Sequence, residues 1–369
     1  MKLPATPCAE AAAPQIIENL GADPRLERAW NELWRRAGGH CYEDYSVAAH
    51  CWEQIAKPAG NKLFCVLIWE DDRLVLAWPL VTFGRGLLRF IKPLSPCGGE
   101  AYSVLVDPQS DVAQAVASAW NRVTAECNCD IFYLPAVRAD SPLHRVIPPS
   151  PRYVSRKDMA PFALLAASDD WNAYRRALAP TMRKEMDYKR RRLLRLPESE
   201  VVWIDPKIYP QRAMQLLDWI LAEKQKWVAK ARKAYTWVDS PSYRDFLMRS
   251  INGPDQTLKY LLCAVQVNKQ PIAGILVAFC PTHVEGVIGA FDPNPSVSKL
   301  SPGSVLVEDV MKFAFQMRLN VDFGTGAEAF KLFWSQGNKV ELSTYHLPLT
   351  RRGKFAVALR SQLHRLGRR

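Results

Sequence analysis

The chain has 369 residues, of which 48% are hydrophobic and 23% are charged, a composition that excludes a largely disordered protein. This length allows two domains of ordinary size, each with its own apolar core. The 49 basic and 37 acidic residues give a formal net charge of +12, which favours an anionic partner.

The chain carries no apolar run long enough to cross a membrane, and residues 1–14 lack the apolar core of a signal peptide. Its nine cysteines are odd in number and scattered, so we expect free thiols, the close pair Cys127 and Cys129 included. These features predict a cytoplasmic protein. The basic segments 175–195 and 351–369 are either solvated helix faces or contacts to transfer RNA or to the inner membrane.

The first half begins with apolar residues at helical spacing and continues with a strand hairpin. Prolines at 142, 148, 149, 151 and 161 then predict a linker or crossover, with a domain boundary, at about 140–162. In chain order we expect helices at 26–37 and 46–55, strands at 62–69, 73–81 and 87–94, a helix at 112–127 and a strand at 130–134.

The second half repeats this order in fuller form, which suggests a structural duplication without repeated residues. Ser168 is a candidate cap for its first helix, and Pro180 is expected to kink or divide that helix. We then expect helices at about 210–228 and 242–251, a meander of strands at 258–267, 271–280 and 283–291, a helix from Ser304 to near Asn320, a short strand ending at Asp322, a helix from about Glu328 and a strand pair around 339–349.

The carboxyl-terminal segment 354–369 is predicted to form an amphipathic helix. We expect its apolar stripe to pack on the body of the protein, and an interfacial membrane helix is the alternative. The stripe consists of Phe355, Leu359, Leu363 and Leu366.

The most informative stretch is residues 321–331, with the sequence VDFGTGAEAFK. Asp322 lies at the carboxyl end of a short strand, where α/β folds usually open their ligand crevices. Gly324 and Gly326 allow the backbone to turn sharply or to approach a ligand closely. This concentration of polar residues predicts a functional site.

Three side chains of this stretch are suited to catalysis. Asp322 and Glu328 are candidate proton acceptors, and Lys331 could stabilise an oxyanion or hold an acceptor phosphate. The structural alternatives are a turn cap for Asp322 and a helical i,i+3 pair for Glu328 and Lys331.

A second candidate site is the start of the helix at Ser301-Pro302-Gly303-Ser304. The first N–H groups of a helix lack intrahelical partners, so such a loop can hold a pyrophosphate. An ordinary helix cap is the alternative.

These two motifs together resemble the signature of GNAT-related acyltransferases, the CelD-like or BioF-like acetyltransferases of polysaccharide biosynthesis, cellulose included. The resemblance rests on Ser301-Pro302-Gly303, a helix, then Asp322-Phe323-Gly324-x-Gly326-x-Glu328-x-Phe330-Lys331 and Trp334, and on the basic helix that contains Arg183. It spans about residues 25–350. Fem-type aminoacyl transferases are more distantly similar.

The resemblance implies an α/β (α+β) fold with two GNAT-like domains, each a mixed, mainly antiparallel sheet flanked by helices. A degenerate domain would occupy residues 15–150, and the acyltransferase domain residues 160–369. It also implies acyl-CoA, such as acetyl-CoA, as an anionic cosubstrate, no metal, and direct attack by an amine or hydroxyl of a sugar or envelope polysaccharide precursor in a ternary complex. On this analogy Asp322, Glu328 and Lys331 are catalytic, Gly289, Ala290, Phe291, Ser301, Gly303 and Ser304 bind the acyl donor, and Arg183, Gly324, Gly326, Phe330 and Trp334 bind the acceptor.

Two other functions stay open. An aminoacyl-tRNA-dependent transferase would use the basic segment 183–195 to bind RNA phosphates, and a noncatalytic accessory protein of polysaccharide synthesis would keep the fold alone. Cys263 and Cys280 are expected to be core thiols. Neither His283 nor His346 lies in a Ser-His-Asp pattern, and the Walker and HExxH motifs are absent, so phosphoryl transfer and zinc hydrolysis rank low.

Overall fold

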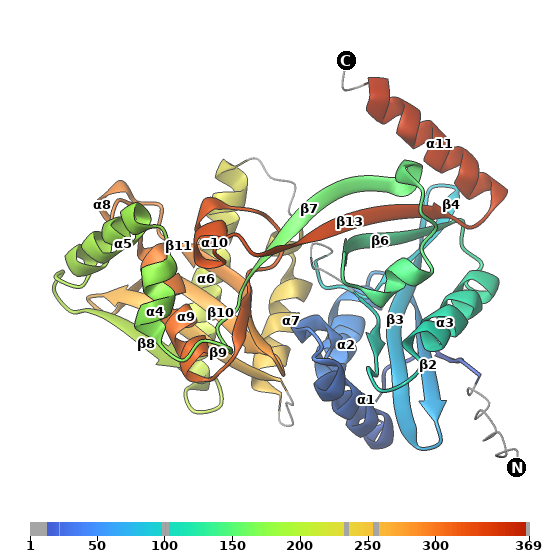
Figure 1. Cartoon of the computed structure of the whole chain (residues 1–369), viewed down its shortest axis with the longest axis horizontal. Coiled ribbons are helices and arrows are strands. Elements are labelled where there is room, and N and C mark those ends of the chain that lie inside the picture. Colours follow the sequence, from blue (N-terminus) through green and yellow to red (C-terminus); the bar gives the residue numbers. More distant parts are fainter. Residues whose placement is uncertain are drawn as a thin grey trace, which may run out of the picture.

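The computed structural model describes residues 13–21, 23–97, 100, 103–231, 236–253 and 258–366. Two halves lie side by side, and one sheet of thirteen strands runs through both (Figure 1). The strand order is β1-β2-β3-β4-β6-β13-β7-β12-β11-β10-β9-β8, with β5 paired to β3. Most neighbours are antiparallel, whereas β4 with β6 and β11 with β12 are parallel pairs.

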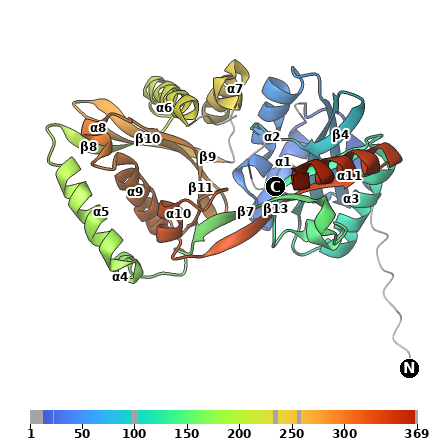
Figure 2. The ribbon, with the colours of Figure 1, turned by 90° about the horizontal axis from the view of Figure 1, so that it is seen from above.

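The first half is a sheet with α1 and α2 on one face and α3 on the other (Figure 2). Alternate residues of β2 serve the two faces, since Cys65 belongs to the core beside α1 and Val66 to the core beside α3. The elements are β1 (Gln15–Ile17), α1 (Pro24–Ala37), η1 (Cys41–Glu43), α2 (Tyr45–Cys51), η2 (Trp52–Ala56), β2 (Lys62–Glu70), β3 (Arg73–Arg85), β4 (Leu88–Pro93), β5 (Leu105–Val106), α3 (Val112–Glu126), β6 (Ile131–Arg138), η3 (Pro142–Arg145) and η4 (Pro151–Tyr153).

The crossover between the halves is the strand β7 (Val154–Ala163), which pairs with β13 (Lys339–Pro348) and with β12. The expected strand pair around 339–349 is wrong, because β13 is a single strand whose partners β6 and β7 come from distant segments. The division into residues 15–150 and 160–369 stays a prediction. The pairing of β13 with β6 returns the last strand to the sheet of the first half.

The second half has α6 and α7 on one face of its sheet and α9 and α10 on the other (Figure 2). Asp170, not Ser168, caps the first helix, and Pro180 starts a separate one. The helix expected to end near Asn320 ends at Gln316, so Asn320 belongs to the following strand, and β8 was not expected. The elements are α4 (Trp171–Ala177), α5 (Pro180–Leu193), β8 (Ser199–Ile204), α6 (Pro210–Lys230), η5 (Thr236–Asp239), α7 (Pro241–Asn252), β9 (Lys259–Val267), β10 (Gln270–Phe279), β11 (His283–Phe291), α8 (Pro295–Ser298), α9 (Pro302–Gln316), β12 (Asn320–Asp322) and α10 (Ala329–Trp334).

A single apolar core joins the two halves on the face of α1, α2, α6 and α7. Trp30 and Trp34 of α1 belong to the same buried cluster as Tyr243 and Phe246 of α7, and α7 packs on α2 and η2. Burial of such large side chains contributes about 1.5–3 kcal/mol each. The junction between the halves is therefore packed like a domain interior.

The carboxyl-terminal helix α11 (Arg351–Leu366) extends from the first half (Figure 1). Its stripe does not pack on the body as expected, because Phe355 is 72% and Leu359 is 47% exposed, whereas Val357 is buried. The described side chains end at Gln362, so those of Leu363 and Leu366 lie outside this comparison. Among the described residues, no helix is both long and apolar enough to cross a membrane.

Candidate functional site

Asp322 is the last residue of β12 and lies where the two halves meet. Its Oδ2 accepts a hydrogen bond from Arg138 Nη1 of β6 at 2.9 Å, and its Oδ1 accepts one from the Gly324 N–H at 2.7 Å. Both side chains of the ion pair are largely buried, with 13% of Arg138 and 10% of Asp322 exposed. A proton acceptor role for Asp322 therefore requires a substrate group to approach an already engaged carboxylate.

The loop after Asp322 is a tight glycine turn, as the sequence predicted. Gly324 has φ +66° and Gly326 has φ +106°. The turn is attached to β7, since the Gly326 N–H donates to the Met159 carbonyl at 2.8 Å. A Cβ atom on Gly326 would lie 2.7 Å from Glu328 Oε2, so glycine also makes room for that carboxylate.

Lys331 and Glu328 are in contact at the start of α10, with 2.9 Å between Nζ and Oε2. Lys331 Nζ also donates to the Thr325 carbonyl at 2.8 Å, which ties α10 to the glycine turn. The lysine side chain is 13% exposed and that of Glu328 is 54% exposed. Lys331 is thus the inward member of the pair.

The predicted donor residues gather around the end of β11. This strand pairs with β12 only from His283 to Glu285, although it continues beside β10 to Phe291. Beyond Glu285, β10 is its only strand partner among the described residues, so its other edge is open. The start of α9 lies next to the end of that edge, since a Cβ on Gly303 would lie 3.6 Å from Phe291 Cδ1.

The N-terminus of α9 is only partly available to an anion. Its N-cap, Ser301, is in the left-handed conformation with φ 50° and makes no side-chain capping bond. The amide of Ser304 donates to the Ser301 carbonyl, while Pro302 has no N–H to offer. Of the predicted donor residues on β11, Phe291 is the one that lies next to this helix start.

Two predicted acceptor-binding residues lie in other settings. Trp334 is 1% exposed and stacks on Trp171 with 6.2 Å between ring centroids, which makes it a core residue. Arg183 Nη1 donates to the carbonyls of Arg175 and Arg176, so it caps the carboxyl end of α4. We remove both from the candidate site, whereas Phe330, which is 40% exposed, remains.

Comparisons with known proteins bear on the fold of the chain. Residues 180–332 match the family model described as an acetyltransferase (GNAT) domain. The second half carries a GNAT-type domain. No curated protein sequence matches the chain significantly.

Similar solved structures extend over both halves. FemX has 11% identity and a TM-score of 0.56 and covers 87% of this chain and 94% of its own. The C-terminal domain (DUF2156) of a putative lysylphosphatidylglycerol synthetase from Agrobacterium fabrum has 10% identity and a TM-score of 0.52, covering 91% and 95%. A conserved protein of unknown function from Bacteroides thetaiotaomicron has 11% identity and a TM-score of 0.50, covering 87% and 97%. These likenesses concern the fold, and the predicted fold class is confirmed.

A buried polar cluster that the sequence analysis missed lies beside this site. His40 Nδ1 is 2.5 Å and His283 Nε2 is 2.7 Å from Glu285 Oε1. Burial alone would lower the pKa of both imidazoles, but their polar contacts have the larger, opposite effect. Glu285 raises the pKa of His40 to about 9, and Cys280 and Glu285 together raise that of His283 to about 11. The sequence could have indicated only that His283 and Glu285, two positions apart in a strand, lie on the same face. His40 could not be linked to them because it is 243 residues away.

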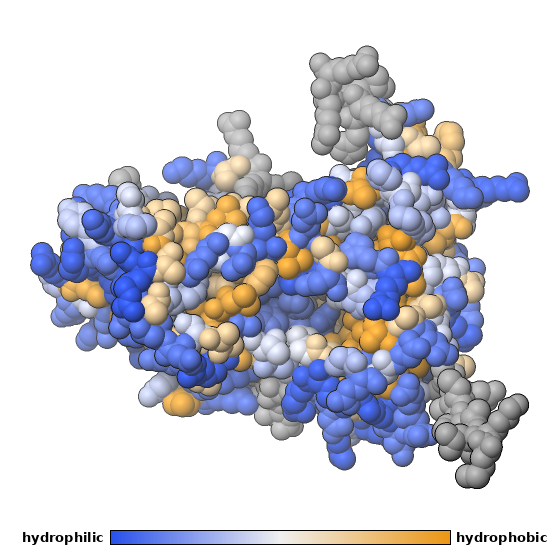
Figure 3. All heavy atoms as spheres, viewed as in Figure 1, coloured by the Kyte–Doolittle hydropathy of each residue, from blue (hydrophilic) through white to orange (hydrophobic). Residues whose placement is uncertain are grey.

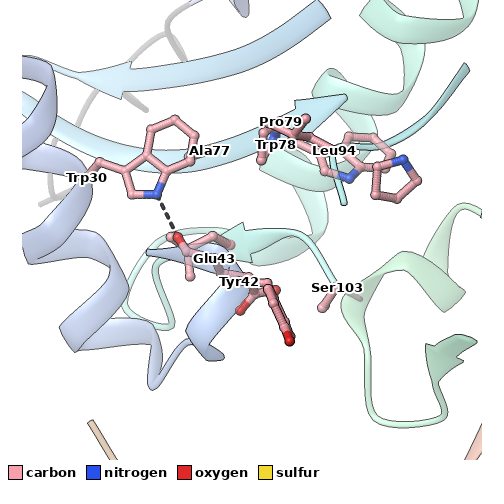
Figure 4. Close-up of a pocket in the computed structure, with 10 residues that line it drawn as sticks. Trp30, Tyr42, Glu43, Ala77, Trp78, Pro79, Leu94 and Ser103 are labelled. Carbon is pink, nitrogen blue, oxygen red and sulfur yellow. Dashed lines mark hydrogen bonds between the residues drawn. The ribbon is translucent and has the colours of Figure 1, made fainter. Parts of the chain in front are cut away.

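A small cavity in the first half is lined mostly by buried side chains (Figure 4). Trp30, Trp78 and Leu94 line it, and the indole N–H of Trp30 donates to the Glu43 carbonyl there. Its lining is mostly apolar, so we assign it no chemistry. On the face shown in Figure 3, hydrophobic residues lie in small patches between hydrophilic ones.

Proposed function

We propose that the protein transfers an acyl group from acyl-CoA, acetyl-CoA in the first instance, to an amine or hydroxyl of a sugar or envelope polysaccharide precursor. The observation that carries this proposal is the separation of β11 from β12 after Glu285, next to the N-terminus of α9. The open edge of β11 offers backbone groups to an amide-containing chain. At the helix start the Gly303 N–H is the candidate donor to a pyrophosphate, because the amides of Ser304 and Val305 already donate to the Ser301 carbonyl. Acyl-CoA carries both chemical features.

The reaction follows from the placement of the two substrates. The acceptor nitrogen or oxygen attacks the thioester carbonyl, the carbon–sulfur bond breaks so that CoA leaves as its thiolate, and the acceptor loses its proton. Asp322, at the point where the strands separate, is our candidate for receiving that proton, and Arg138 holds its carboxylate in place. Lys331 would stabilise the negative charge that develops on the thioester carbonyl oxygen.

Aminoacyl-tRNA-dependent transfer of the Fem type is the second candidate. The similarity in fold to FemX over both halves favours it. The basic face of α5 is less available than the sequence suggested, because Arg190 pairs with Glu308 and Asp309. Arg191 and Arg192 are exposed and remain able to contact RNA phosphates. A noncatalytic accessory role is the third candidate.

Contact with a membrane surface would suit a lipid-linked acceptor. The exposed Phe355 and Leu359 on the basic helix α11 support this part of the proposal. Sedimentation with anionic vesicles tests it, and a variant with both residues changed to serine should stay in the supernatant.

Calorimetry with acetyl-CoA tests the proposed donor. We expect binding by the wild-type protein and by Gly303→Ala, because a Cβ at 3.6 Å from Phe291 is an ordinary contact. Gly303→Glu should weaken binding at least 10-fold, since its carboxylate would repel a pyrophosphate at the start of α9. Unchanged binding by Gly303→Glu would contradict the donor site.

Turnover separates the three candidate functions. With an identified donor and acceptor, Asp322→Asn and Lys331→Ala should lower turnover while acetyl-CoA binding is kept. Binding of acetyl-CoA without any turnover would favour the accessory role. Binding of aminoacyl-tRNA with a steep dependence on salt, and no acetyl-CoA binding, would favour the second candidate.

A further inference from the structure

Three side chains from the two halves converge at the end of α1 and the start of β11. His40 lies in the loop after α1, and His283 and Glu285 are the first and third residues of β11. His40 Nδ1 and His283 Nε2 are 3.2 Å apart, and both are within 2.7 Å of Glu285 Oε1. The side chains are 19%, 10% and 12% exposed, so the cluster is largely shielded from water.

Surrounding contacts fix the orientation of both rings. His283 Nδ1 is 3.0 Å from Thr282 Oγ1, so Nδ1–H can donate to the hydroxyl, and an ion bound at Nε2 would displace the proton that Nε2 shares with Glu285. The backbone of His40 is held by Trp34, whose indole N–H donates to the His40 carbonyl at 2.8 Å, and by Glu43. The loop approaches β11 closely, since a Cβ on Gly38 would lie 3.3 Å from Thr282 Cγ2.

Two buried thiols complete the surroundings. Cys41 forms side-chain contacts with Cys280 and Glu285, and Cys280 also contacts His283. The Cys41 N–H lies 3.4 Å from Glu285 Oε2, so each carboxylate oxygen has its own partners. Both cysteines are free thiols. The ligand atoms that lie within 4.8 Å of one another are the two imidazole nitrogens and the carboxylate oxygen, and a thiol next to them would have to turn toward an ion to become the fourth ligand.

We propose that His40, His283 and Glu285, together with the thiolate of Cys41 or Cys280, bind a Zn²⁺ ion that links the two halves. Zinc takes four nitrogen, sulfur or oxygen ligands in tetrahedral geometry at about 2.0–2.3 Å. Two imidazole nitrogens at about 2.0–2.1 Å from a tetrahedral ion are roughly 3.3 Å apart, and the ring nitrogens here are separated by 3.2 Å. The Glu285 oxygen, which is 2.5 and 2.7 Å from the two nitrogens, would move outward by roughly 0.6–0.8 Å to reach the same separation.

The position of the cluster indicates a structural ion. Two of its ligands come from β11 and one from the loop of the first half, so the ion would cross-link segments 243 residues apart. Glu285 is also the register partner of Asp322 on β12, at the last pair before the strands separate. The ion would thus fix the strand edge on which the proposed donor site depends, although its binding can be measured without any activity.

The protein as purified, without chelator or metal-affinity resin, provides the first test. We expect about one zinc per chain by elemental analysis, and removal of zinc by a chelator should lower the melting temperature, with recovery on addition of Zn²⁺. Replacement by Co²⁺ should give the visible bands of a tetrahedral ion together with a near-ultraviolet thiolate band. Cys41→Ser or Cys280→Ser, whichever thiolate is the ligand, should remove that thiolate band.

Variants locate the ion. His40→Gln and Glu285→Gln should each lower the zinc affinity at least 10-fold, whereas His346→Gln, a half-buried histidine elsewhere, should keep it. Because such variants can also misfold, the wild-type measurement decides. A chain that contains no zinc, takes up none from solution and melts at the same temperature with and without Zn²⁺ would overturn the proposal and leave a hydrogen-bonded charge cluster. Stoichiometric Co²⁺ binding without a thiolate band would overturn the sulfur ligand.

Discussion

Arg138 on β6 and Asp322 on β12 form a largely buried ion pair across the junction of the two halves, with 2.9 Å between Nη1 and Oδ2. Arg138 also pairs with Asp140 at 3.0 Å, so one guanidinium holds the candidate base and the loop after β6 together. The position of the Asp322 carboxylate therefore depends on the packing of the two halves, because Arg138, which holds it, belongs to the first half.

Removal of the Arg138 guanidinium should destabilise the protein. Arg138→Met leaves the Asp322 carboxylate buried without its cation, which costs about 3 kcal/mol. The matched control is Arg156→Met on β7, which β13 separates from β6. Its pair with Asp158 is 70% exposed on the arginine side and worth at most about 1 kcal/mol. Urea unfolding measures both. Equal unfolding midpoints for the two variants would show that the buried pair contributes no more to stability than the exposed pair.

The two glycines of the turn should respond differently to alanine. Gly324→Ala meets no atom within 4 Å and should cost about 1–2 kcal/mol for its left-handed backbone alone. Gly326→Ala should cost more and lower activity, because φ +106° is foreign to alanine and its Cβ would displace the Glu328 carboxylate.

Gly86→Ala, at φ +61° in open space, is the control for Gly324→Ala, and the two should lose similar stability. If the clash with Glu328 matters, Glu328→Ala should partly restore a Gly326→Ala protein. No restoration would assign the whole effect to the backbone.

Local pattern predicted much of this fold. The helical spacing of Trp30 and Leu33 and the apolar alternation of β2 and β3 are strong signals, and Pro180 divides α4 from α5 because proline cannot continue a helix interior. The Asp322 turn was also found from sequence, since two glycines after a strand are a local feature. Both glycines do adopt positive φ.

The pairing of strands and side chains that are far apart in the chain could not be predicted from the sequence. The partners of β13 are more than 170 positions away, so the hydrophobic pattern of residues 339–348 suggested a local hairpin. For the same reason Arg138 was missed as the partner of Asp322, and His40 as the partner of Glu285. Trp334 matched a family motif, but only packing on Trp171 revealed it as a core residue.

Acid should destabilise the protein through His346. Burial, with the positive charge of Arg360, lowers the pKa of His346 to about 4. The unfolded chain, with a pKa of about 6.5, therefore binds the proton first. The contribution of His346 to stability should be constant above about pH 6.5, fall as the pH drops toward 4, and level off below that.

His346→Gln should flatten part of this slope in urea titrations between pH 4 and 6.5. His50, whose pKa burial also lowers to about 4, should account for a further part. Arg360→Met should raise the NMR titration midpoint of His346. A wild-type slope retained by His346→Gln would contradict the assignment.

Lys331 and Glu328 should differ in importance although they form one ion pair. The lysine is inward and holds the Thr325 carbonyl of the glycine turn, whereas the glutamate is 54% exposed and its pairing in solvent is worth at most about 1 kcal/mol. Lys331→Met should lower kcat/KM roughly 100-fold, the usual effect of losing one group that stabilises a developing negative charge. Glu328→Gln should change kcat/KM by less than about 3-fold and change the free energy of unfolding by no more than about 0.5 kcal/mol.

Lys331→Arg keeps the positive charge but changes the shape of the group that carries it. If this variant recovers substrate binding but not kcat, the position of the ammonium in the transition state matters. Equal losses for Lys331→Met and Glu328→Gln would instead make the pair the functional unit and restore Glu328 as a candidate base.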